Sequence, residues 1–227
     1  MYAVQAAPSD KVDCSKVEEI LDDMGAAQGM TTLNDKYKLQ TTPDEYTKRC
    51  QEMSDAVKVL RKYNKECYSS LTQQVLSAML RTRSQMNEER CKDPNSEAFK
   101  EGLEGVKCVA ENAVEKVREA EKKIVLSFQV LHEASIPDDK LRVRRSCCAV
   151  QDSKRLFLEA TKEKCSKHEA LYNQYVESFS SEAMGLICPE LDKLECSKLE
   201  PIKTDGVEIK SKFFLTPMVK LVKTLDH

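Results

Sequence analysis

The sequence has no tryptophan and few residues that interrupt helices. Only 6 Gly and 7 Pro occur among 227 residues, and β-branched residues do not gather into alternating runs. This shortage, together with 33% charged residues, argues against a sheet-rich protein and favours helices with one solvated face. No apolar run approaches the roughly eighteen residues that cross a bilayer, so we expect no transmembrane segment.

Catalytic and metal-binding signatures are also missing. There is no G-x-S-x-G, H-E-x-x-H, P-loop or glycine-rich dinucleotide turn, and His132, His168 and His227 have no motif partners. Three histidines are too few, and the cysteines are too widely spaced, for a zinc site. We therefore expect a protein without catalytic residues, metal or cofactor, and we interpret His168 as a surface histidine.

The charges exclude a further class of partner. Lys and Arg total 36 against 38 Asp and Glu, so no net field draws the chain to nucleic acid or anionic lipid. No Asn-x-Ser/Thr sequon is present, because Asn95-Ser96-Glu97 misses the pattern by one position. We expect neither a nucleic-acid partner nor N-glycosylation.

What the chain does contain is cysteine. Ten cysteines spread along the sequence indicate an oxidising compartment, and their even number favours paired thiols over a thiol nucleophile. Val4-Gln5-Ala6 resembles the small-residue tail beside a signal-peptidase site. We predict a secreted, extracellular protein whose signal peptide is removed, held by a disulfide framework of Cys14, Cys50, Cys67, Cys91, Cys108, Cys147, Cys148, Cys165, Cys188 and Cys196.

The cysteine spacing occurs twice. Sixteen residues separate Cys50 from Cys67 and twenty-three separate Cys67 from Cys91; the intervals from Cys148 to Cys165 and on to Cys188 are sixteen and twenty-two. This repetition predicts an internal duplication in which equivalent cysteines pair in equivalent ways. Spacing alone leaves about 945 pairings open. The adjacent Cys147 and Cys148 cannot easily bond to each other, so we expect them to reach two different helices.

Caps and apolar periodicity place the helices. They predict helices over residues 11–24, from Thr42-Pro43 to about 63, and over 66–86, 149–164 and 166–180, with a short docking helix from Thr216-Pro217. An apolar stripe from Val106 to Leu131 predicts one long helix over about 97–134, with Gly102 and Gly105 as the expected place for a kink.

These elements predict an all-α, disulfide-stapled helical bundle with two related halves joined by the long helix. We expect an N-terminal arm with a short helix over residues 1–42 and a first half over 43–139. A basic connector follows over 140–147, and a second half with the docking helix covers 148–227.

The connector carries the run Arg142-Val143-Arg144-Arg145-Ser146. An R-x-R-R run in an exposed loop is what furin-like secretory proteases cut, so Arg142, Arg144 and Arg145 form a candidate processing site. The alternative is a solvated basic connector, which is the commoner role of such runs.

Three functions fit a secreted helical protein without catalytic groups. The first is binding of a protein partner, which predicts an exposed apolar patch of more than a few hundred Å². The second is carriage of an apolar small molecule or lipid in an enclosed apolar cavity of about 300 Å³ or more, lined by aromatic residues such as Phe128, Phe157 and Phe179. Those side chains also suit an ordinary core. The third is a structural or matrix role, which predicts self-association.

The cysteine order resembles the secreted haemolymph-glycoprotein family of arthropods. The likeness covers Cys50 to Cys188 and lies in the twenty-three-residue step to Cys91, the step on to Cys108, and the sixteen- and twenty-two-residue steps of the second copy. The chain departs from the family's pattern by lacking one further cysteine inside each sixteen-residue interval. The resemblance implies an extracellular, non-enzymatic helical protein, and it supplies no site residues.

Overall fold

The computed structural model describes residues 12–26, 33, 38–134, 136, 138–188 and 193–225. Every regular element in these residues is helical, which confirms the all-α class. The helices are α1 (Val17–Ala26), α2 (Pro43–Cys67), α3 (Ser70–Cys91), α4 (Glu97–Asn112), α5 (Val114–Glu133), α6 (Asp139–Cys165), α7 (Glu169–Ile187) and α8 (Leu215–Lys223).

Side-chain caps fix several helix starts. Thr42 accepts a hydrogen bond from the Glu45 backbone amide while the Glu45 carboxylate accepts one from the Thr42 amide, a complete capping box in front of Pro43. Ser96 caps α4 and Asp138 caps α6 in the same way, through the free amides of the first turn. The start of α2 is therefore as predicted, whereas α2, α3 and α7 all end later than their apolar stripes indicated, at Cys67, Cys91 and Ile187.

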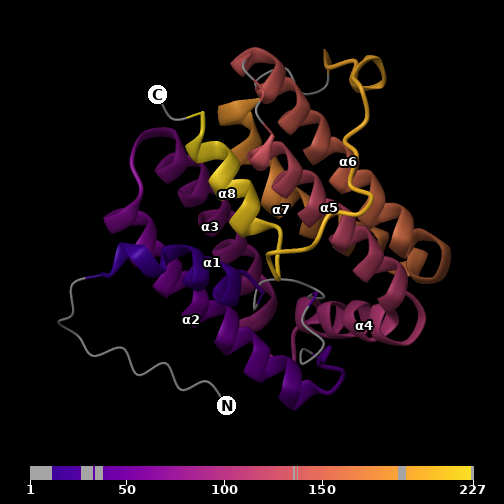
Figure 1. Ribbon diagram of the computed structural model, residues 1–227. Helices are drawn as coiled ribbons and strands as arrows, with labels where there is room; N and C mark the ends of the chain where they lie inside the picture. Colours follow the sequence, from indigo (N-terminus) through magenta and orange to yellow (C-terminus); the bar gives the residue numbers. More distant parts are fainter. Residues whose placement is uncertain are drawn as a thin grey trace.

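The long helix predicted over 97–134 is wrong. Two helices occupy this stretch, α4 and α5, and they turn away from each other at Ala113, which has φ −138° and ψ 1°; Figure 1 shows their different directions. Gly102 and Gly105 lie inside α4 without interrupting it. Val106 and Val109 are buried before the bend and Val117 after it, so the apolar stripe continues although the helix does not.

The basic connector predicted over 140–147 is also wrong, because α6 begins at Asp139 and runs through it. Asp138 supplies the cap, accepting hydrogen bonds from the Lys140 and Leu141 amides. The arginines of the run therefore lie in the first turns of a helix of 27 residues. The second half of the chain has no loop at its expected start.

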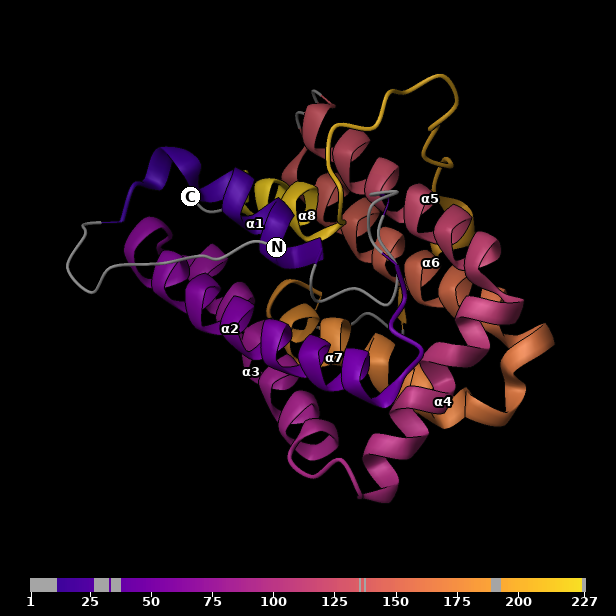
Figure 2. The ribbon, with the colours of Figure 1, turned by 90° about the horizontal axis from the view of Figure 1, so that it is seen from below.

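The packing centres on α3 and α7, which lie against each other along their length. The pair α5 and α6 packs beside them, and α8 packs against α1, α3 and α5. Figure 1 shows α8 near the centre of the view with α3 and α5 on either side of it, and Figure 2 shows α1 beside α8. The buried side chains form two clusters, one around α8 and one between α4, α6 and the start of α7.

All ten cysteines are paired, as the even count predicted. The bonds are Cys14–Cys67, Cys50–Cys91, Cys108–Cys165, Cys147–Cys188 and Cys148–Cys196. Cys14 ties the segment before α1 to the end of α2. The adjacent Cys147 and Cys148 do not bond to each other and tie α6 to two different segments, the end of α7 and the short turn Cys196–Lys198. None of the described helices is long and apolar enough to span a membrane.

Between Cys196 and α8 the chain follows an extended path held by side chains of other helices. The buried Gln129 amide donates to the Glu208 carbonyl at 2.9 Å and accepts from the Lys210 amide at 3.0 Å. Both oxygens of the Asp22 carboxylate accept a hydrogen bond from the Lys212 backbone amide at 2.9 Å. This path delivers Phe213 and Phe214 to the interior immediately before α8.

Candidate ligand-binding site

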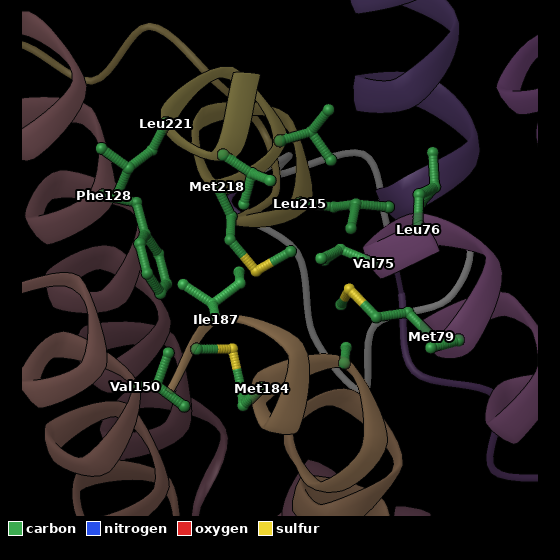
Figure 3. Close-up of a cluster of buried hydrophobic side chains, with 14 of the residues drawn as sticks. Val75, Leu76, Met79, Phe128, Val150, Met184, Ile187, Leu215, Met218 and Leu221 are labelled. Atoms are coloured by element: carbon green, nitrogen blue, oxygen red, sulfur yellow. The ribbon is translucent and has the colours of Figure 1, made fainter. Parts of the chain in front are cut away.

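An apolar cavity of about 70 Å³ lies where the two core clusters meet. Its walls come from α5, α6, α7, α8 and the two phenylalanines that precede α8. Figure 3 shows Phe128 of α5, Val150 of α6, Met184 of α7 and Met218 of α8 pointing toward one another in this region. We call it the aromatic cavity, and its ring-bearing walls are Phe128, Phe157, Tyr175, Phe179, Phe213 and Phe214.

The three phenylalanines selected from the sequence all lie on this cavity. Phe128 and Phe157 are buried and Phe179 is half-buried, and each comes from a different helix. Phe179 stands at the centre of the ring contacts, with centroids 5.2 Å from Tyr175 and 5.0 Å from Phe214. The structure thus brings the predicted residues together; their role toward a ligand stays a hypothesis.

A few polar groups border the aromatic cavity. Glu121 of α5 lines it and is buried, with 6% of its surface exposed. Lys154 of α6 also lines it and pairs with Glu177 of α7 at 2.7 Å, closer to solvent. The Ser153 hydroxyl donates a hydrogen bond to the Ala149 carbonyl, so it is satisfied within α6. The cavity is therefore mostly apolar, with an ionisable side chain at two points of its border.

A second pocket, of about 40 Å³, contains three arginines that the sequence analysis did not identify. Arg49 of α2 and Arg83 and Arg90 of α3 expose 4%, 2% and 9% of their surface. Tyr46, Tyr175, Met53 and Met86 are among the other residues that line it. We call it the arginine pocket, and it shares Tyr175 with the aromatic cavity.

Each of these arginines donates a hydrogen bond to a neutral side chain. Arg49 donates to the Gln40 side-chain oxygen at 2.9 Å, Arg83 donates to the Ser178 hydroxyl at 3.3 Å, and Arg90 donates to the Gln174 side-chain oxygen. The Arg83 guanidinium also lies over two rings, 4.9 Å from the centroid of Tyr175 and 4.5 Å from that of Phe179.

Burial lowers the pKa values of two of these arginines, Arg83 and Arg90. Desolvation, opposed by Tyr175 and reinforced by the neighbouring charges of Arg49 and Arg90, lowers the pKa of Arg83 to about 10. Desolvation also lowers the pKa of Arg90, against the pull of Tyr46, Glu101 and Glu89. Both groups keep their charge at neutral pH.

One signal in the sequence could have identified this pocket. Met79, Met86 and two arginines, Arg83 and Arg90, recur at steps of four, three and four along α3, the spacing of a buried face. An arginine in phase with apolar residues is a charge placed toward the core, which is expensive unless something stabilises it. Arg49 carries no comparable signal that we can identify.

The other candidate residues are not brought together. The candidate processing site is neither extended nor in a loop, because α6 runs through it. Arg142 and Arg145 are half-buried there and form ion pairs with Asp139 and Glu200. Cleavage there requires the first turns of α6 to unwind. His132 lies in α5 and His168 packs on the Tyr172 ring, at different places in the fold. Within the described residues, no group of His, Cys, Asp and Glu side chains has the arrangement of a metal site.

No family model, curated protein or solved structure matches this chain.

Proposed function

We propose that the protein is a secreted, non-catalytic binding protein that carries a small apolar ligand in the aromatic cavity. The observation that carries this proposal is the meeting of six aromatic rings and two methionines around one small, partly open apolar pocket. Ligand sites of this kind are concave, mostly apolar and bordered by a few polar groups. Glu121 and Lys154 supply such groups here.

The alternative of a protein partner has less support. It requires a contiguous apolar patch on the surface, whereas Leu186, with 43% exposed, is the single large hydrophobic residue exposed within the described ranges. An isolated exposed leucine is ordinary on a folded protein. A structural or matrix role likewise gains nothing from the described surface.

The size of the cavity restricts the ligand. About 70 Å³ is well below the 300 Å³ expected for a drug-sized molecule, and it is smaller than the engineered cavity of about 150 Å³ that binds benzene. The ligand is therefore either very small or makes room by moving side chains. Met184 and Met218 are flexible thioethers, and Phe179 and Phe214 are half-buried, so these four side chains can move at least cost.

Secretion and duplication belong to the same proposal. Five disulfides fit an oxidising, extracellular setting. Cys50–Cys91 and Cys147–Cys188 each span 41 residues and each ties the first helix of a hairpin, α2 or α6, to the end of the next one. Cys14–Cys67 and Cys108–Cys165 each tie the end of that first helix to an upstream segment. These pairs support two related halves, with Cys147 rather than Cys148 equivalent to Cys50.

The proposal is tested by filling the cavity. We expect benzene to bind the native protein in a calorimetric titration, and short aliphatic alcohols to compete with it. Val176→Phe adds a ring to the cavity wall from a half-buried position and should weaken binding at least about tenfold, about 1.4 kcal/mol. Val143→Phe, also half-buried but away from the cavity, is the matched control. Equal binding by both variants, or none by the wild type, would overturn the carrier function.

A further inference from the structure

The sequence contains a single Asp-Gly pair, and the pair lies in an exposed turn of the segment before α8. Asp205 and Gly206 are both exposed, and the Val207 backbone amide donates a hydrogen bond to the Thr204 carbonyl at 3.3 Å, which closes the turn around them. Figure 2 shows the gold-coloured chain between Cys196 and α8 looping outward from the helices. Solvent therefore reaches both residues of the pair.

Both reacting groups of this pair are accessible to each other. Within the described part of the chain, the Asp205 carboxylate forms no hydrogen bond or ion pair. Gly206 has φ +75°, a conformation that suits glycine, and no heavy atom lies within 4 Å of the position that a Cβ atom would take. Any other residue would partly cover its own backbone nitrogen with a side chain. The Gly206 nitrogen therefore lies next to the Asp205 carboxyl group without steric cover.

This arrangement permits a reaction that needs only water. The Gly206 nitrogen attacks Cγ of Asp205, a C–N bond forms, and the amide proton leaves with the carboxyl OH as water. The product is a five-membered cyclic imide. Water then opens the imide at either carbonyl: opening at Cγ restores aspartate, and opening at the main-chain carbonyl leaves the chain running through the side chain, as isoaspartate. One water leaves and one returns, so the mass does not change.

We propose that Asp205 is a site of spontaneous covalent modification, at which the folded protein converts aspartate to isoaspartate. The exposed turn, the unrestrained carboxylate and the uncovered glycine nitrogen together support this assignment. Asp152-Ser153 provides the contrast within the same chain. It lies inside α6, where the helix fixes the backbone and Arg155 pairs with the Asp152 carboxylate at 3.3 Å, so it should stay aspartate.

The modified chain should keep its fold. Isomerisation adds one carbon to the main chain of the turn, and the chain is anchored on both sides of it. Cys196 is bonded to Cys148 before the turn, and the Gln129 side chain holds the backbone of Glu208 and Lys210 after it. The extra carbon is therefore absorbed between these anchors, and the two phenylalanines that precede α8 stay in place. The modification site is thus independent of the carrier function.

Incubation of the full, oxidised protein at neutral pH and physiological temperature tests the proposal. Chromatography and electron-transfer fragmentation of digests separate aspartate from isoaspartate at Asp205 and at Asp152. A synthetic peptide of residues 199–211 is the unfolded reference. We expect isoaspartate at Asp205 to accumulate at a rate within about threefold of the peptide rate, because an unrestrained turn opens at almost no free-energy cost. Asp152 should remain unchanged.

Two variants identify the reacting atoms. Gly206→Ala adds a methyl group beside the attacking nitrogen and disfavours the positive φ, so it should slow accumulation about tenfold or more. Val207→Ala changes the residue after the reacting pair and should leave the rate unchanged. A native rate more than about tenfold below the peptide rate overturns the proposal, since it shows that the fold protects the turn. Equal rates in Gly206→Ala and the wild type, or equal rates at Asp205 and Asp152, also overturn it.

Discussion

Two glycines of α4 lie where neighbouring side chains come closest to its backbone. A Cβ atom on Gly102 would overlap the Tyr46 hydroxyl, and one on Gly105 would overlap a Leu171 methyl group. The Tyr172 hydroxyl also donates to the Gly105 carbonyl at 3.0 Å. These glycines therefore serve close packing, which explains why a helix passes through two residues that the sequence analysis assigned to a kink.

Replacing Gly102 tests this explanation. In Gly102→Ala the added methyl group meets the buried Tyr46 ring, which packs edge-on against Phe99 at 5.0 Å and cannot move far. We expect a loss of about 1–2 kcal/mol in the free energy of unfolding, after the gain in helix propensity is included. Gly185→Ala in α7 is the control: nothing lies within 4 Å of its Cβ, so it should be neutral or stabilising by up to about 1 kcal/mol. Equal effects of the two changes in urea denaturation would refute the packing role.

His132 makes the stability of the folded protein depend on pH. Burial, and then the charge of Lys220, lower its pKa below 6.5, with Glu133 and Glu18 opposing them, and its Nδ1 has no hydrogen-bond partner among the described residues. The unfolded chain therefore takes up the proton first as the pH falls, so the contribution of neutral His132 to stability is complete above about pH 6.5 and is lost below it.

The corresponding measurement compares melting temperatures of the wild type and His132→Gln between neutral pH and pH 5. The wild type should lose more stability than the variant over this interval, so the difference between them should shift in favour of the variant. Parallel curves for the wild type and His132→Gln would exclude this contribution.

At the scale of elements, disulfides decide where segments without regular structure lie. Cys148–Cys196 fixes the beginning of the path that carries Phe213 and Phe214 to the aromatic cavity. Gln129 and Asp22 hold the same path further along. Both side chains are polar and buried, and both form hydrogen bonds with the backbone of the segment.

Removing that bond should loosen the segment selectively. We expect Cys148→Ala with Cys196→Ala to lower the free energy of unfolding by about 2–4 kcal/mol and to open new protease cleavage sites between 197 and 211. Cys108→Ala with Cys165→Ala should lose a similar free energy without cleavage in that interval, because that bond ties α4 to the end of α6. Cleavage between 197 and 211 in both variants, or in neither, would contradict this role of Cys148–Cys196.

The elements also show the limits of sequence-based prediction. Caps such as Thr42-Pro43 fixed helix starts correctly, since they act through neighbouring residues. The bend at Ala113 could not be seen, because both sides of it face the core and the apolar stripe runs on unchanged. The early start of α6 was missed because its first turns carry arginines, although Asp138 is a cap of the expected kind.

At the scale of the whole molecule, two cores meet at one aromatic cavity. The all-α class and the paired cysteines followed from composition and cysteine number, which are properties of the whole chain. The grouping of Phe128, Phe157 and Phe179 could be suspected but not established, because it depends on how α5, α6 and α7 pack. The arginine pocket forms where α2 meets α3 and α7. Residue spacing along α3 indicates Arg83 and Arg90, but it cannot show that Arg49 of α2 joins them.

Methyl NMR of the protein labelled at methionine tests the interior ligand site most directly. Met184 and Met218 line the aromatic cavity, Met53 and Met86 line the arginine pocket, and the buried Met79 lines neither. On titration with decanol we predict that the Met184 and Met218 signals shift saturably while the Met79 signal stays in place. Unchanged Met184 and Met218 signals at saturating decanol, or equal shifts of all methionine signals, would contradict the proposal that this protein binds an apolar ligand in its interior.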